Sequence, residues 1–255
     1  MKENLPTVRL FGVPFCKLGM DDTVRLLTET ILESGPARKP HQVITANPIM
    51  IMTALERPDY MAIMKNADLI VPDGAGAVWA ARYVGNPVAE RVPGFDLMHR
   101  LLKSGEAWGW RVYLLGAAPE TIREAHRRLA GAFPGIRFVG CRDGYFGEEE
   151  DDAVIAEIRA AEPDLLFVGR SADKQEPWIA RHKERLGVPV MMGVGGSFDV
   201  IAGKLKRAPA SWQRMRLEWL YRLLQEPSRY KRMYALPKFA WKVIRHRGDV
   251  QRDIW

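Results

Sequence analysis

The sequence predicts an α/β fold in which a parallel β-sheet carries helices on both faces, with a helical segment added at the C-terminus. Short apolar runs alternate with longer amphipathic stretches up to about residue 196, which is typical of βαβ units with right-handed crossovers. Beyond Ser211 the apolar residues recur at helical spacing only. Together these observations favour a Rossmann-like core followed by helices.

The strands are predicted where short, mostly apolar runs are bounded by glycine, proline or polar residues. In chain order they are Thr7–Gly12, Gln42–Thr45, Asp68–Val71, Arg111–Leu115, Arg137–Gly140, Asp164–Val168 and Pro189–Val194. The first helix is capped by Asp21 or Asp22 and ends near Gly35, and the second continues through a methionine-rich stretch to about Lys65. Further helices are expected over residues 75–84, 95–104, from Pro119 onward, 148–161 and 175–186.

Composition narrows the class of protein. With 255 residues, 47% of them apolar, the chain is long enough for one large α/β domain with an appendage. Its two cysteines, Cys16 and Cys141, argue against a disulfide scaffold and fit a reducing cytosol. No Cys/His cluster has metal-ligand spacing, so neither a metal nor a cofactor is expected. Residues 1–6 do not read as a signal peptide, and no run of about 18 apolar residues occurs, so we expect a soluble or peripheral protein.

The positive charge belongs to the C-terminal segment, residues 204–255. It holds 14 Lys/Arg against 4 Asp/Glu, a balance of +10 within a net charge of +7, so residues 1–203 carry about −3. Half of the eight tryptophans lie there. We therefore divide the chain into an α/β core, residues 1–203, and a basic, tryptophan-rich helical appendage, residues 204–255.

Four interpretations of this segment remain open from the residues alone. It lies in an anionic membrane interface, it binds nucleic acid, it closes over an active site and offers arginines to a diphosphate, or it is a docked helix with a solvated face. No recognition motif supports nucleic acid.

Three predicted strands end in polar and glycine residues, at Thr45–Pro48, Val71–Gly76 and Gly193–Asp199. Ligands of open α/β sheets bind at the carboxyl ends of the strands. A carboxylate at Asp73 is placed to take a proton from a hydroxyl nucleophile, but aspartate there is also a common helix cap. Thr45 and Asn47 have the same two interpretations, as caps or as ligands.

Glycine-rich turns supply a second signal. Gly193-Val194-Gly195-Gly196 leaves backbone room for the close approach of a diphosphate, whereas Gly116–Pro119 is a weaker phosphate turn. The dinucleotide fingerprint is absent, which counts against a nucleotide-cofactor oxidoreductase as the alternative enzyme. The non-enzymatic alternative is a basic adaptor that binds a membrane or nucleic acid.

Read together and in order, these segments resemble the WecG/TagA/CpsF family, glycosyltransferase family 26, across roughly residues 40–235. The matching pieces are Thr45–Pro48, Pro72–Gly74, Glu90–Leu97, Leu115-Gly116, Asp143–Phe146, Lys174–Glu176, Gly195–Asp199, Ile201–Pro209 and Leu217–Pro227. The resemblance implies an inverting, metal-independent transfer from a UDP-sugar to a polyprenyl-diphosphate-linked sugar, for bacterial surface polysaccharide. The donor sugar would be N-acetylmannosamine, its uronic acid or glucose.

The resemblance also implies roles for individual residues. Asp73 would be the general base, with Thr45 and Asn47 lining its pocket. The residues expected to contact the donor, the acceptor or the diphosphate are Arg91, Gln175, Tyr145, Asp199, Gly195, Gly196, Arg222, Arg229 and Arg232. Tyr145 and Asp199 would hold the uridine, and the last three arginines would reach the diphosphate.

The expected partners are therefore the two substrates and a membrane surface, with no nucleic acid and with self-association through the core. The expected location is the cytoplasm, at the inner face of the cell membrane. One departure from the family pattern is Gly169-Arg170-Ser171-Ala172-Asp173, where a turn with glycine and proline is usual. Arg170 either suits an acidic sugar or pairs with Asp173.

Overall fold

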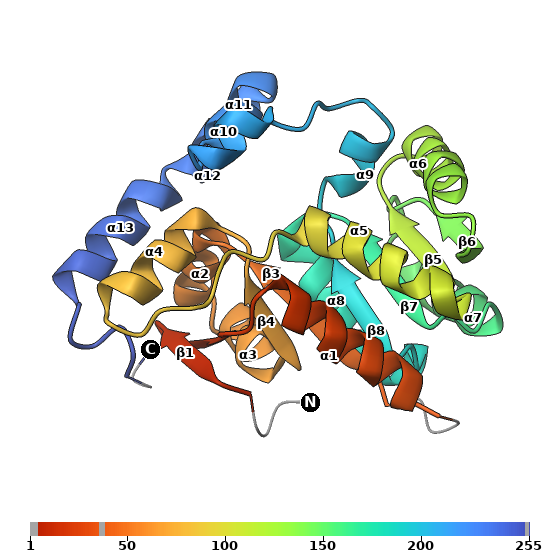
Figure 1. Cartoon of the computed structure of the whole chain (residues 1–255), viewed down its shortest axis with the longest axis horizontal. Helices are drawn as coiled ribbons and strands as arrows, with labels where there is room; N and C mark the ends of the chain where they lie inside the picture. The colour runs from red at the N-terminus through yellow and green to blue at the C-terminus, as the bar shows by residue number, and fades with distance from the viewer. Residues whose placement is uncertain (1–4, 36–38, 253–254) are drawn as a thin grey trace.

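A computed structural model describes residues 5–35, 39–252 and 255 of the chain. A six-stranded parallel sheet lies at the centre, in the order β4-β3-β8-β7-β5-β6, with helices on both faces (Figure 1). The sheet strands are β3 (His41–Ala46), β4 (Leu69–Pro72), β5 (Arg111–Gly116), β6 (Arg137–Arg142), β7 (Leu165–Gly169) and β8 (Val190–Gly193). The predicted α/β fold with a parallel, Rossmann-like sheet is confirmed.

The helices confirm the alternating pattern. Those of the α/β part are α1 (Met20–Glu33), α2 (Pro48–Glu56), α3 (Pro58–Asn66), α4 (Ala75–Tyr83), α5 (Gly94–Gly105), α6 (Pro119–Ala132), α7 (Asp151–Ala160), α8 (Ala172–Leu186) and α9 (Ser197–Ile201). Those that follow are α10 (Ala210–Arg214), α11 (Glu218–Gln225), α12 (Tyr230–Met233) and α13 (Ala235–Arg245).

The sheet is buried on both faces, which explains why its strands are almost wholly apolar. In β7, Leu165 and Phe167 join the cluster beneath α1, α5 and α6, whereas Leu166 and Val168 pack against α7 and α8. Successive side chains of a strand point to opposite faces, so one short run serves two cores.

The strand order reverses beside β3, and this reversal locates the site. β3 pairs with β4 on one side and with β8 on the other, and Thr45 of β3 stands in register with Val71 of β4. In such sheets a crevice opens at the carboxyl ends of the strands where the order reverses. Two of the three polar strand ends therefore meet, and the third, after β8, is their neighbour.

The first predicted strand is not part of this sheet. Thr7–Leu10 is β1, which pairs antiparallel with an unpredicted strand, β2 (Val13–Cys16), in a two-stranded hairpin. Phe11 and Gly12 make the turn with φ of 53° and 81°, the backbone that tight hairpins require. The parallel alternation therefore begins at β3 and not at residue 7.

Two helix predictions also need correction. The N-cap of α1 is Gly19, not Asp21 or Asp22, and the Met20 N–H donates to the Glu90 carboxylate at 2.7 Å. The single helix expected up to Lys65 is two helices, because Pro58 has no N–H to continue α2 and disfavours helical backbone at Arg57.

The apolar residues that recur at helical spacing just beyond Ser211 are likewise divided between α10 and α11, and Arg216 between these helices takes a φ of 61°. The C-terminal helices lie along one side of the molecule, and α13 runs beside α4 and α2 (Figure 1). Phe239 and Val243 of α13 are buried in the same cluster as α2, α4 and the β1–β2 hairpin. Within residues 5–35 and 39–252, no helix is long and apolar enough to cross a membrane.

Candidate active site

A cavity of about 620 Å³ lies between the strand ends and the C-terminal helices. Its polar lining includes Thr45, Asn47, Asp73, Arg91, Ser197, Lys206, Arg207, Arg216, Glu218, Arg222 and Arg229. Its apolar lining includes Pro48, Ile49, Trp79, Phe95, Trp219, Met233, Leu236, Phe239 and Ala240. The cavity thus has walls from both parts of the chain, and both charged and apolar side chains line it.

Asn47 caps α2 and still offers donors to a ligand. Its Oδ1 accepts hydrogen bonds from the backbone N–H groups of Ile49 and Met50, at 3.0 and 3.2 Å. The capping interpretation of Asn47 is therefore confirmed. Its side-chain amide nitrogen has no hydrogen-bond partner among the described residues, which leaves two N–H donors for a bound hydroxyl or carbonyl.

Thr45 lies beside Asn47 at the end of β3, against the start of α5. A Cβ added to Gly94 would stand 2.7 Å from the Thr45 hydroxyl oxygen, so only glycine allows this approach. The hydroxyl of Thr45 borders the cavity together with the side chains of Asn47 and Asp73. The structure therefore brings the three residues predicted at the first two strand ends into one place.

Asp73 follows β4 at the floor of the cavity. Its backbone N–H donates to Ala46 at 2.9 Å, and its carboxylate accepts a hydrogen bond from the Gly94 N–H. The N-cap of α4 is Gly74, without a side-chain cap, so the capping interpretation fails for Asp73. Its carboxylate is therefore free of helix capping and borders the cavity.

Burial raises the pKa of Asp73 to about 6. The carboxylate of Glu218 acts in the same direction, whereas Arg91, the Gly94 N–H and Arg222 favour the ionised form. At neutral pH Asp73 is mostly ionised but is a stronger base than an exposed aspartate. This is the property that a general base needs.

Arg91 joins the core to the C-terminal segment. It forms an ion pair with Glu218 at the start of α11, and the two side chains are 23% and 24% exposed. Both line the cavity. Sequence reasoning assigned no role to Glu218, although it lies inside the matching segment Leu217–Pro227.

The three arginines expected at the diphosphate have different surroundings. Arg222 lies against the glycine turn after β8: a Cβ on Gly196 would stand 2.8 Å from its Nη2. Burial lowers the pKa of Arg222. Arg229 lines the cavity and forms an ion pair with Glu226 at 2.6 Å. Arg232 is exposed and is not part of the cavity wall, so the structure does not bring it to the site.

Gln175 is held away from the cavity by a buried network. Its Oε1 accepts the Gly195 N–H at 3.1 Å, and its Nε2 donates to Glu176 at 2.8 Å. The other carboxylate oxygen of Glu176 accepts from Gln42 of β3 at 3.0 Å. Burial raises the pKa of Glu176 to about 7. In this structure Gln175 supports the glycine turn and is not in the cavity wall, and Glu176 is a buried carboxyl that sequence reasoning passed over.

Of the other residues predicted to bind substrate at the turn after β8, only one lines the cavity. Gly195 has a φ of 52° and lies behind the cavity wall, whereas Gly196 is in it. Asp199, in α9, is outside the wall, and burial raises its pKa.

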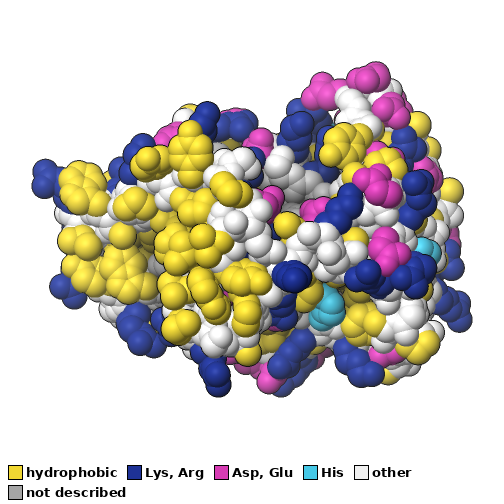
Figure 2. All heavy atoms as spheres, turned by 90° about the horizontal axis from the view of Figure 1, so that it is seen from above, with side chains coloured by type: hydrophobic (Ala, Val, Ile, Leu, Met, Phe, Trp, Pro, Cys, Tyr) yellow, Lys and Arg dark blue, Asp and Glu magenta, His cyan; other side chains and the backbone are white. Residues whose placement is uncertain are grey.

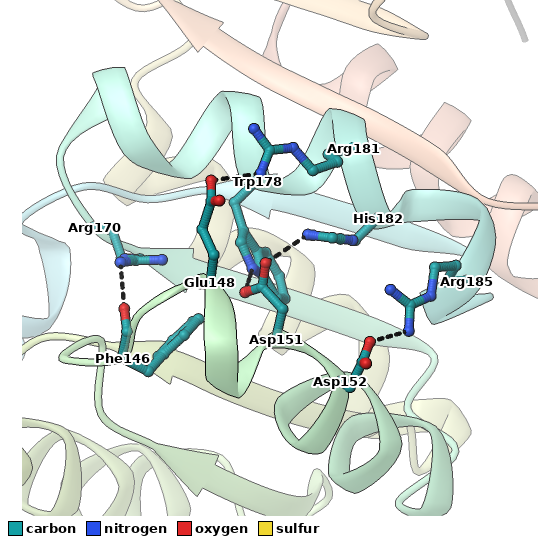
Figure 3. Close-up of polar contacts among 9 residues, drawn as sticks. All are labelled: Phe146, Glu148, Asp151, Asp152, Arg170, Trp178, Arg181, His182 and Arg185. Carbon is teal, nitrogen blue, oxygen red and sulfur yellow. Dashed lines mark hydrogen bonds and ion pairs between the residues drawn. The ribbon is translucent and has the colours of Figure 1, made fainter.

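Tyr145 is 78% exposed on the loop after β6 and does not line the cavity. The loop beneath it is firmly attached. Arg170 donates to the Phe146 carbonyl at 3.2 Å, and its guanidinium lies over the Phe146 ring at 4.3 Å (Figure 3). No ion pair joins Arg170 to Asp173 within the described ranges, so the pairing suggested for these two residues is not found.

A second anchor follows directly in the chain. Asp151, at the start of α7, accepts hydrogen bonds from Trp178 Nε1 at 2.7 Å and is paired with His182 Nε2 at 3.0 Å, both from α8 (Figure 3). The ring of Trp178 also packs edge-on against Phe146. The loop that carries Tyr145 is therefore held between β7 and α8.

The parts of the chain that the structure describes contain no group of three or more His, Cys, Asp or Glu side chains arranged to hold a metal ion. The positive charge at the cavity comes from lysine and arginine side chains. Sequence reasoning assigned no role to three of them, Lys206, Arg207 and Arg216. Lys206 lies in a matching segment, but only the folded structure brings it to the cavity.

Comparison with known proteins gives a consistent result. Residues 8–253 match the sequence profile of the Glycosyl transferase WecG/TagA/CpsF family. A Bacillus spizizenii protein named N-acetylglucosaminyldiphosphoundecaprenol N-acetyl-beta-D-mannosaminyltransferase is 39% identical over 204 residues, which cover 80% of this chain and 79% of that protein. A Staphylococcus aureus protein with the same name is 36% identical over 254 residues, 98% of this chain and 97% of that protein.

Proposed function

The chain belongs to the WecG/TagA/CpsF family of glycosyl transferases, and from this premise we propose the reaction that it catalyses. The proposed donor is a UDP-sugar of the N-acetylmannosamine type, and the acceptor is N-acetylglucosamine linked through a diphosphate to undecaprenol. The names of the two relatives supply the acceptor and the transferred sugar. The observation that carries the proposal is Asp73, a carboxylate of raised pKa in a cavity that six lysine and arginine side chains also line.

The proposed chemistry is a direct displacement with inversion. Asp73 takes the proton of the acceptor hydroxyl as its oxygen bonds to the anomeric carbon, and the bond from that carbon to UDP breaks. UDP leaves with the electron pair, and fixed positive charge stabilises it. Arginine and lysine side chains supply that charge without a metal ion, which supports a metal-independent transfer. Thr45 and Asn47 orient the sugars beside Asp73.

The apolar region of the cavity supports a lipid acceptor. Trp79 of α4 and Leu236 and Ala240 of α13 line the same cavity as the lysine and arginine side chains. An acceptor with a diphosphate between a sugar and a prenyl chain needs both environments side by side. In the proposed complex the first prenyl units lie against these side chains.

The outer surface supports a membrane-bound site of action at the inner face of the cell membrane. Hydrophobic side chains gather on the side that carries the C-terminal helices (Figure 2). The large exposed apolar residues of this segment are Met215, Trp219, Leu224, Tyr230, Tyr234, Trp241 and Ile244. Aromatic and apolar side chains among many lysines and arginines are typical of helices that lie in an anionic interface.

The experiment is a panel of UDP-sugars, scored for UDP release by the purified protein with a short-chain prenyl-diphosphate-N-acetylglucosamine. Release only with UDP-N-acetylmannosamine and this acceptor is the expected result, and it should persist in excess EDTA. Release with only a different UDP-sugar would show that the transferred sugar is not N-acetylmannosamine. Failure to release UDP from any donor, on vesicles containing anionic lipid as well as in solution, would refute the proposal.

A further inference from the structure

The cations around the cavity are not equivalent, because some of them already have a carboxylate partner. Three ion pairs neutralise half of the six basic side chains that line it: Arg91–Glu218, Arg207–Asp96 at 2.6 Å and Arg229–Glu226 at 2.6 Å. A cation in a close ion pair has little net charge left for a ligand.

The other three cations are Lys206, Arg216 and Arg222. None of them has an ion-pair partner within the described parts of the chain. Arg222 is the least exposed of the three: burial lowers its pKa, while the charges of Glu226, Asp73 and Asp199 act in the opposite direction without forming an ion pair with it. Lys206 and Arg216 are exposed, so their charges are available to an anion that enters the cavity beside Arg222.

The backbone of Lys206 is tied to α11, the helix that carries Arg222, by a reciprocal pair of hydrogen bonds. Its backbone N–H donates to the Gln225 side chain at 2.8 Å, and Gln225 Nε2 donates back to the Lys206 carbonyl at 2.9 Å. Gln225 lies three residues after Arg222 on α11, about one helical turn away. The segment after α9 is thereby tied to α11, and both side chains border one cavity.

Arg216 reaches the same wall from the turn between α10 and α11. Its φ of 61° is uncommon for a residue with a side chain. Two backbone hydrogen bonds hold the turn, from Arg216 N–H to Gln213 at 3.0 Å and from Leu217 N–H to Trp212 at 2.9 Å. Left-handed backbone outside glycine is costly and tends to be kept where it positions a functional group.

We propose that Lys206, Arg216 and Arg222 form one anion site that binds a substrate diphosphate, with Lys206 and Arg216 as binding residues that have had no assigned role. The inference rests on the proposed function and specifies which side chains hold the diphosphate. The two guanidinium groups bind phosphate oxygens through paired N–H donors, and the ammonium adds a point charge. Arg232, which faces solvent outside the cavity, is not part of this site.

Calorimetric titration of the full-length protein tests the site without requiring turnover. The probes are UDP, uridine and geranyl diphosphate, and the variants are Lys206→Ala and Arg216→Ala. Arg214→Ala is the control, because it removes the same charge from an exposed residue of α10 that does not line the cavity. Thermal melting confirms that each variant is folded.

We expect each site variant to bind a diphosphate about tenfold more weakly than the control does, with uridine affinity unchanged. A loss confined to UDP assigns the site to the donor, and a loss confined to geranyl diphosphate assigns it to the lipid acceptor. Affinities equal to those of Arg214→Ala, or an equal loss for uridine, would overturn the inference. Wild-type protein that binds none of the three probes would instead count against the proposed function.

Discussion

The two walls of the cavity are built in different ways. On the core side, Thr45, Asn47 and Asp73 stand at the ends of central strands, and backbone hydrogen bonds hold the segments on which they lie. On the other side, the cations lie on α11 and in the short segments before and after it, and this part of the chain also exposes large apolar side chains. We therefore propose that the core fixes the geometry of the chemical step, whereas the C-terminal segment provides positive charge and closes the cavity.

Several contacts hold the second wall against the first, although α10, α11 and α12 contain no buried residue. One is the ion pair of Arg91 with Glu218 at the cavity. Another is the burial of Phe239 and Val243 of α13 beside α2 and α4. Elements with few buried contacts open more easily than a sheet does. Variants at these points therefore separate the two contributions.

The largest effect is expected at the core. Asp73→Asn keeps the shape of the side chain but removes its capacity to accept a proton, so kcat should fall about a thousandfold. The thermal midpoint should change little. The measurement is UDP release at saturating donor and acceptor. A variant with a normal kcat would show that Asp73 is not the general base.

The next largest effect is expected on stability, when the packing of α13 against the core is disrupted. Phe239→Ala should lower the free energy of unfolding by about 3–5 kcal/mol, because the ring is buried against the core. Trp241→Ala, from the same helix but 62% exposed, should cost less than about 0.5 kcal/mol and should instead weaken binding to anionic vesicles. Denaturant unfolding and vesicle sedimentation measure both. The reverse ranking would mean that α13 is not attached as described.

The ion pair of Arg91 with Glu218 should affect the pH dependence of kcat/KM. With Asp73 as base, kcat/KM should rise with pH through about 6, where its carboxyl ionises. The charge of Glu218 disfavours this ionisation, so Glu218→Gln should move the rise to lower pH, by roughly half a unit to one unit. Arg91→Gln should move it to higher pH. Identical profiles for all three proteins would show that these side chains do not act on the base.

The smallest effect is expected on the loop that carries Tyr145, away from both walls. Arg170→Ala removes a hydrogen bond and a cation–π contact, together worth about 1–2 kcal/mol. On the family-based expectation that Tyr145 holds the uridine, the KM for the UDP-sugar should rise several-fold while kcat stays nearly constant, because the loop loses its position and Asp73 does not. Arg181→Ala, which breaks an exposed ion pair with Glu148 on the same side, is the matched control. Equal KM values for the two variants would show that Arg170 does not position this loop for substrate binding.

Much of the core site was predictable because its signals are local. Asn47 follows a strand and precedes a proline, and Asp73 follows an apolar run and precedes glycine. Short-range sterics and capping determine such positions. The break at Pro58 was also visible in the sequence but was overlooked. The β1–β2 hairpin was not predicted, because its turn puts Phe11 at a positive φ that its residue type disfavours.

By itself, the sequence determined the α/β alternation, the polar strand ends and the concentration of positive charge after residue 203, since each depends on periodicity or composition. Tertiary structure alone decided that Gln175 supports a glycine turn, that Arg91 is paired with Glu218, and that Arg222 enters the cavity while Arg232 faces solvent. These outcomes depend on which distant segments pack together and on which charges find partners there. The local chain specifies a side chain and its helix, but its neighbours determine whether its charge is available to a substrate.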